Sequence, residues 1–161
     1  MRVKGKALTG PILGLIGGIL LVLGGFLWIY LYINVIEATL NSYGLTYADV
    51  SGYNYHLWYL NASLTFLWGG IGILGAVFAM HGKRYAGFLL LAVGFISILG
   101  LFVIRIGEPV LVDLGGGYYL QLRPIPLSGC LIIIDPFLVL TGGVLTFLVK
   151  GENQNVSKLK I

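Results

Sequence analysis

Four long apolar stretches constrain this chain more than any other feature of its sequence. They lie within residues 8–36, 57–80, 85–106 and 130–149. Each is long enough to cross a hydrocarbon layer about 30 Å thick, for which about 18 to 20 apolar residues suffice. Because 58% of the residues are hydrophobic and only 10% are charged, the chain has too little polar surface to cover a water-soluble globule. We therefore expect an all-α integral membrane protein, a single domain over residues 1–161 built as an antiparallel bundle of four transmembrane helices.

The charges between these stretches predict their orientation. Short segments rich in Lys and Arg stay in the cytoplasm. One side carries a single acid, Glu152, with eight basic residues: Arg2, Lys4, Lys6, Lys83, Arg84, Lys150, Lys158 and Lys160. The other side carries two basic and five acidic residues. We therefore predict a multi-pass protein of the cell membrane with both termini in the cytoplasm. Its outer loops cover about residues 37–56 and 107–129, and its polar tail, residues 151–161, is expected to be frayed.

The connections between the helices predict two hairpins. Only four residues, 81–84, separate the second stretch from the third, so these two helices should be antiparallel neighbours. In the second outer loop, Glu108–Asp113 and Tyr118–Arg123 flank a turn at Leu114–Gly117. This pattern of strand, turn and strand predicts an external β-hairpin that caps the bundle. Whether residues 45–50 of the first outer loop add a third strand stays open.

Aromatic residues are concentrated on the outer side of the predicted membrane. Nine of the ten tyrosines fall at or beyond the outer interface, although aromatic belts normally occupy both interfaces. Tyrosine is enriched where proteins meet, but an outer cap without disulfides could equally need aromatic side chains for its own core. The residues assigned to this outer cap are Tyr53, Tyr55, Trp58, Tyr118, Tyr119 and Arg123.

Small residues recur at a spacing of four within the first two apolar stretches, in the pattern known as GxxxG. Because lipid provides no hydrophobic drive for helix association, small residues favour association by letting two backbones approach closely. These faces could pack the four helices together, or one of them could receive a second copy or a partner. The predicted helix-packing residues are Gly10, Gly14, Gly18, Gly72, Gly75, Ala76 and Ala79.

Asp135 is the most informative single residue. Counting back from Lys150 places its carboxylate inside the outer boundary of the hydrocarbon, where a charge is costly. Since Asp135 precedes Pro136, it could be the N-cap of a short fourth helix that follows a non-helical segment at residues 131–134. Alternatively, Asp135 could pair with Arg105, with Glu37 nearby, and line a polar pocket or an ion path.

Recognisable chemistry is otherwise lacking. Gly70–Gly75 formally matches a dinucleotide-binding motif, but it lies in the middle of a predicted span rather than after a strand. His56 and His81 fall on opposite sides of the membrane, so they cannot share a metal ion. The sequon Asn61-Ala62-Ser63 lies where the second helix enters the membrane. We expect no enzymatic activity, no cofactor, no metal site and no nucleic-acid partner.

These observations favour a non-catalytic structural or interaction subunit. Besides the lipid bilayer, its partner would be a second copy of itself or another membrane protein, bound through the glycine-rich helix faces and the tyrosine-rich outer cap. The alternative is a small channel or transporter component that uses Asp135 and Arg105.

Overall fold

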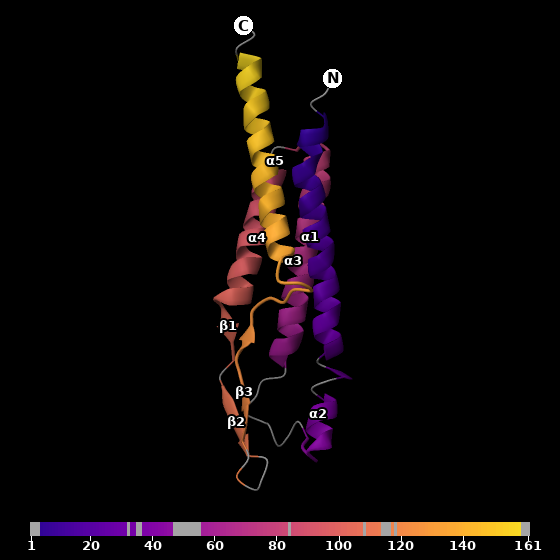
Figure 1. The fold of residues 1–161 in the computed structure, drawn as a ribbon, viewed down its shortest axis with the longest axis vertical. Coiled ribbons are helices and arrows are strands. Elements are labelled where there is room, and N and C mark those ends of the chain that lie inside the picture. Colours follow the sequence, from indigo (N-terminus) through magenta and orange to yellow (C-terminus); the bar gives the residue numbers. More distant parts are fainter. Residues whose placement is uncertain are drawn as a thin grey trace.

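A computed structural model describes residues 4–31, 33–34, 37–46, 56–83, 85–107, 109–113, 117 and 119–158. The fold is mainly helical with a small β-hairpin (Figure 1), as the sequence predicts. Two helices contain a segment that is long and apolar enough to cross a membrane, Leu8–Leu31 and Leu57–Met80. The apolar segments of two further helices, Ala86–Phe102 and Asp135–Val149, are shorter.

The described helices are α1 (Lys4–Leu31), α2 (Glu37–Ser42), α3 (His56–Met80), α4 (Ala86–Phe102) and α5 (Asp135–Lys158). Helix α1 packs against α3 and α5, and α4 packs against α5 and α3, so the long helices run side by side (Figure 1). Both chain ends lie at the same end of this arrangement, and α2 lies near the opposite end.

Two boundaries differ from the sequence expectation. The first helix is expected to reach residue 36; α1 ends at Leu31, residues 33–34 are π-helical, residues 32, 35 and 36 lie outside the described residues, and the short helix α2 begins at Glu37. The third is expected to reach residue 106, but α4 ends at Phe102, because residues 105–106 form a strand. The tail differs as well: it is expected to be frayed, whereas α5 remains helical to Lys158.

The helical hairpin between α3 and α4 is confirmed, and its turn has a clear cause. Gly82 has a φ of +77°, a conformation that costs glycine little. The N–H of Lys83 donates to the carbonyl of Phe78 at 2.9 Å, and the N–H of Gly82 donates to that of Ala79 at 3.0 Å. These two bonds form a Schellman motif, which satisfies the last carbonyls of α3 and ends the helix.

The predicted β-hairpin is present and is extended by a second strand pair. Strands β2 (Val110–Asp113) and β3 (Tyr119–Leu122) are antiparallel, and Val110 pairs with Leu122. Strands β1 (Arg105–Ile106) and β4 (Ile125–Pro126) form a separate antiparallel pair. Both pairs lie beyond the end of α4 and point away from the chain termini (Figure 1). Of the possible third strand, residues 45 and 46 are not in a strand, and 47–50 lie outside the described residues.

A compact apolar cluster fills the space between the long helices. Leu21, Leu90 and Val139 are completely buried, and they come from α1, α4 and α5. Ala76 of α3 and Val93 of α4 complete the cluster, with Leu15, Trp68 and Ile71 packed around it. We refer to the five buried residues as the apolar cluster.

Candidate functional site

An irregular segment, residues 127–134, connects β4 to α5. Its first part packs closely against α1 and α4, whereas the side chains of residues 132–134 are exposed. At its start, the N–H of Leu127 donates to the carbonyl of Ile104 at 3.0 Å, and the N–H of Ser128 donates to that of Gly100 at 3.3 Å. The segment is therefore tied to the end of α4. The expectation that residues 131–134 are non-helical is confirmed.

Buried side chains from α3 satisfy the backbone of this segment and of β4. Asn61 Nδ2 donates to the carbonyl of Pro126 at 2.5 Å. Thr65 Oγ1 accepts a hydrogen bond from the N–H of Gly129 at 2.6 Å and donates to the carbonyl of Asn61 at 2.7 Å. A backbone group that is buried without a hydrogen-bond partner is costly. These polar side chains therefore stabilise the irregular segment by supplying partners for its backbone.

Ser128 adds a contact to α4. Its hydroxyl donates to the carbonyl of Ser97 at 3.0 Å, and both serines are buried. We use the name polar seam for the buried polar residues that border the irregular segment: Asn61, Thr65, Ser97, Ser128 and Asp135.

Glycines make the close approach of this segment possible. A Cβ added at Gly24 of α1 would lie 2.5 Å from the backbone nitrogen of Leu131. A Cβ at Gly100 would lie 2.5 Å from Ser128 Oγ, and one at Gly129 would collide with the indole ring of Trp28. No side chain fits at these three positions without a shift of the neighbouring atoms.

Asp135 is completely buried at the start of α5. Its Oδ2 atom accepts hydrogen bonds from the N–H groups of Leu131 at 2.6 Å and Ile132 at 3.0 Å. An N-cap would instead accept from N–H groups inside the helix, so the predicted N-cap geometry is wrong in detail. The carboxylate points back and fastens the irregular segment to the beginning of α5.

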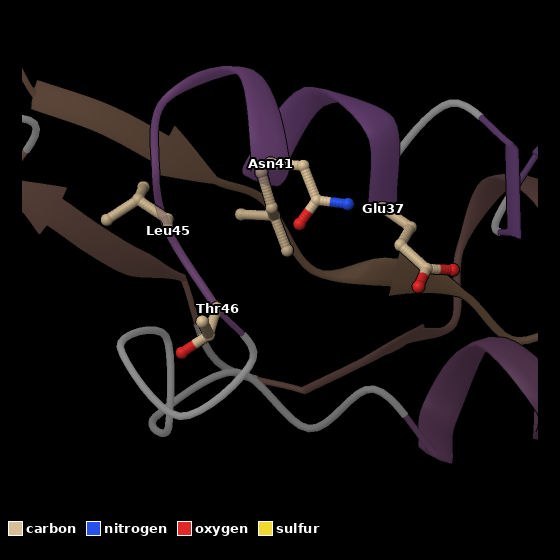
Figure 2. Close-up of a pocket in the computed structure, with 5 residues that line it drawn as sticks. Glu37, Asn41, Leu45 and Thr46 are labelled. Atoms are coloured by element: carbon tan, nitrogen blue, oxygen red, sulfur yellow. The ribbon is translucent and has the colours of Figure 1, made fainter.

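The predicted pairing of Asp135 with Arg105 is not present. Arg105 lies exposed in β1 rather than at the end of a helix, and Asp135 Oδ1 has no hydrogen-bond partner among the described residues. Glu37 is exposed at the start of α2. There it lines a cavity of about 160 Å³ together with Leu40, Asn41, Leu45 and Thr46 (Figure 2). The three charges proposed for one polar site are therefore spread over three places.

The predicted helix-packing residues lie at contacts within this chain. A Cβ at Gly10 would lie 2.6 Å from the nitrogen of Thr146 in α5, and one at Gly18 would lie 2.9 Å from that of Ile73 in α3. Gly14 faces Leu90 of α4. In α3, Gly72 faces Gly18 and Gly75 faces Leu90, while Ala76 and Ala79 are buried.

Gly70 is an exception among the glycines of the long helices. A Cβ added there would meet no atom within 4 Å. The position forms part of an open, apolar groove of about 460 Å³ along α3, whose other lining residues are Ser63, Phe66, Leu67, Ile71 and Leu74.

The predicted outer cap is described only in part, because Tyr53, Tyr55 and Tyr118 lie outside the described residues. Trp58 packs against Trp28 with ring centroids 5.3 Å apart. Tyr119 in β3 is exposed, and so is Arg123, the residue directly after that strand. Trp58 thus takes part in helix packing, whereas Tyr119 faces outward.

Sequence reasoning missed most of the polar seam. A signal was present, because Asn61 and Thr65 are four residues apart and therefore share one face of an apolar helix. In the sequence, Asn61 stands out only as part of a glycosylation sequon, but its side chain is completely buried. Ser97 stood alone in an apolar stretch, and Ser128 follows the irregular backbone, so neither position could be paired from sequence spacing.

In the part of the chain that the structure describes, no three His, Cys, Asp or Glu side chains gather as a metal site would require. Comparisons with protein-family models, with curated proteins and with solved structures found no match to this chain. The polar seam and the groove at Gly70 are therefore the features from which a function can be argued.

Proposed function

We propose that all four long helices cross a membrane and that both termini lie in the cytoplasm. The 17 residues of α4 span about 26 Å at 1.5 Å per residue, which is close to the hydrocarbon thickness of a bilayer. The apolar part of α5 is shorter still, but the irregular segment before it lengthens the stretch of chain that crosses the hydrocarbon. Irregular backbone at membrane depth is tolerated where protein surrounds it, and the polar seam supplies that surrounding.

The outward faces of the helices support this proposal. On α1, large apolar side chains recur every three or four residues and are all exposed: Leu8, Ile12, Ile16, Ile19, Leu23 and Phe26. The inward face of the same helix carries glycines. Small residues inside and large apolar residues outside are typical of helices that pack together in lipid. In water, the same arrangement would expose a large apolar surface, which soluble monomers rarely do.

We further propose that the protein is a non-catalytic membrane subunit that associates with a second copy or a membrane partner through the Gly70 face of α3. The groove at Gly70 carries this proposal. The other glycines discussed on α1 and α3 are already in contact with neighbouring helices, whereas Gly70 leaves room for a close approach from outside the chain.

Cross-linking and native mass spectrometry of the protein extracted from its own membrane test this function. Gly70→Leu places a large side chain in the groove, at a position where the Cβ itself meets no atom within 4 Å, so we expect it to abolish the associated species. Val144→Leu adds bulk at an exposed position of α5 and should leave association unchanged. A wild-type protein that is extracted alone, or a Gly70→Leu variant that associates like wild type, would contradict the proposal.

A second candidate function is a small channel or transporter component, and the polar seam favours it. Buried ionisable groups within membrane spans commonly mark ion or proton paths, and interrupted helices commonly border transport sites. Asp135 meets both descriptions, although without Arg105. If this candidate is correct, Asp135→Asn abolishes flux in reconstituted vesicles and leaves the association measured above intact.

A further inference from the structure

Among the buried polar side-chain atoms that lack a hydrogen-bond partner within the described residues, which include Asn61 Oδ1, three lie on three different helices. They are Nε1 of Trp68 on α3, Oγ of Ser97 on α4 and Oδ1 of Asp135 on α5. Ser97 is 1% exposed and Asp135 is 0% exposed. A buried polar group without a partner costs about 1 to 3 kcal/mol, so three such groups in one protein require an explanation.

Contacts between the helices place Trp68 and Ser97 at the same depth. A Cβ at Gly75 of α3 would lie 3.2 Å from the Leu90 side chain of α4, and these two helices are antiparallel. Trp68 lies seven residues, or two helical turns, before Gly75 on α3. Ser97 lies seven residues after Leu90 on α4, so both residues are displaced from the contact in the same direction. Both residues remain on the sides of their helices that face each other.

Asp135 reaches this depth from α5. Val93 and Val139 belong to the same apolar cluster. One turn beyond Val93 lies Ser97, and one turn before Val139 lies Asp135, so the two residues form the next layer of the interior. Trp68 packs against the apolar cluster as well. The three unpartnered atoms therefore border a common layer directly above the apolar cluster.

The chemistry of the three atoms is complementary. The Trp68 indole can only donate a hydrogen bond, a carboxylate oxygen of Asp135 can only accept one, and the Ser97 hydroxyl can do either. A buried water typically makes about three hydrogen bonds to otherwise unsatisfied polar groups. We propose that Trp68, Ser97 and Asp135 bind a water molecule, which accepts from the indole and donates to the carboxylate.

The surroundings favour water over a larger or charged ligand. The stretches Leu8–Leu31, Leu57–Met80 and Ala86–Phe102 contain no Asp, Glu, Lys or Arg. Outside the apolar stretches, the same helices carry ionisable groups only towards their ends: Lys4 and Lys6 on α1, His56 on α3, and Lys150, Glu152 and Lys158 on α5. The other titratable groups on these elements are Tyr30 and Tyr59, and the Cys130 thiol lies in the irregular segment. The remaining polar seam connects this layer with the β-hairpin end of the molecule, which gives water a polar route.

This inference deepens the second candidate function, since a bound water beside a buried carboxylate is what a proton or ion path would contain. The site and the path are nevertheless tested separately. Flux through vesicles reports on transport, whereas the hydration of Trp68 can be measured on the full chain in detergent micelles whether or not anything is transported.

The experiment uses protein labelled with ¹⁵N in the indole groups, whose three N–H resonances are assigned by replacing each tryptophan with Phe. We expect the Trp68 resonance to show magnetisation exchange with bound water. In Ser97→Ala this exchange should be lost and the resonance should move. Asp135→Asn should also move the resonance, because the amide replaces an acceptor of the bound water.

Thr146→Val is the matched control, because Thr146 is buried in α5 far from this layer and bonds to its own helix. It should leave the Trp68 resonance in place. Unchanged Trp28 and Trp58 resonances show that a variant is folded, and Ser97→Ala suffices as a test if Asp135→Asn does not fold. A Trp68 indole without exchange to water, or one that is insensitive to Ser97→Ala in a folded protein, would overturn the proposal.

Discussion

The Oδ2 atom of Asp135 lies 2.6 Å from the backbone nitrogen of Leu131. The first residue of α5 thus holds the segment that precedes the helix rather than the helix itself. This contact, together with the second one to Ile132, fastens the irregular segment to the start of α5 through a completely buried carboxylate.

Removing this carboxylate should destabilise the protein strongly. Asp135→Ala leaves two buried N–H groups, those of Leu131 and Ile132, without their acceptor. We expect a loss of about 2 to 4 kcal/mol in the free energy of unfolding, measured by denaturation in detergent micelles. Arg105→Gln, a charge change at an exposed position of β1, should change this free energy by less than about 0.5 kcal/mol. Equal effects of the two substitutions would contradict this role of Asp135.

Thr65 should matter through its hydroxyl rather than its shape. Thr65→Val keeps the volume but removes the acceptor of the Gly129 N–H, so we expect about 1 to 3 kcal/mol of destabilisation. Thr65→Ser restores the hydroxyl and should recover part of the loss. The same unfolding measurement distinguishes the two variants, and a Val variant that is as stable as the Ser variant would show that the hydrogen bond contributes nothing.

Two identical substitutions at Gly24 and Gly70 should have opposite effects. Gly24→Ala places a Cβ 2.5 Å from the nitrogen of Leu131, so the irregular segment must shift and the protein should lose about 1 to 3 kcal/mol. Gly70→Ala meets open space and should gain up to about 1 kcal/mol from helix propensity. Comparing their unfolding midpoints tests the packing directly, and a neutral Gly24→Ala would refute the close approach of this segment.

The proposed topology makes a prediction about labelling from outside the cell. In a Cys130→Ser background, Tyr119→Cys in β3 should react with a membrane-impermeant maleimide on intact cells. Lys158→Cys at the end of α5 should react only after permeabilisation, because positively charged segments remain in the cytoplasm. The reverse labelling pattern would invert the orientation, and equal labelling of both positions on intact cells would contradict the membrane-spanning arrangement.

The sequence alone determined the mainly helical character of the chain, the helical hairpin at residues 81–84 and the position of the β-hairpin. Each of these follows from local rules: apolar length, a glycine that can adopt positive φ, and alternating residues around a turn. For the same reason, the sequence pointed to Asp135 and to the non-helical residues before it.

Only the tertiary structure decided which helix side chains meet the irregular segment. The polar seam joins Asn61 and Thr65 of α3 to residues more than 60 positions later in the chain, and sequence spacing has no rule for such pairs. Likewise, the predicted third helix ends before Arg105, because Arg105 lies in β1 and pairs with Pro126 of β4. Local propensity fixes elements, whereas the hydrogen bonds of an irregular segment depend on which helices surround it.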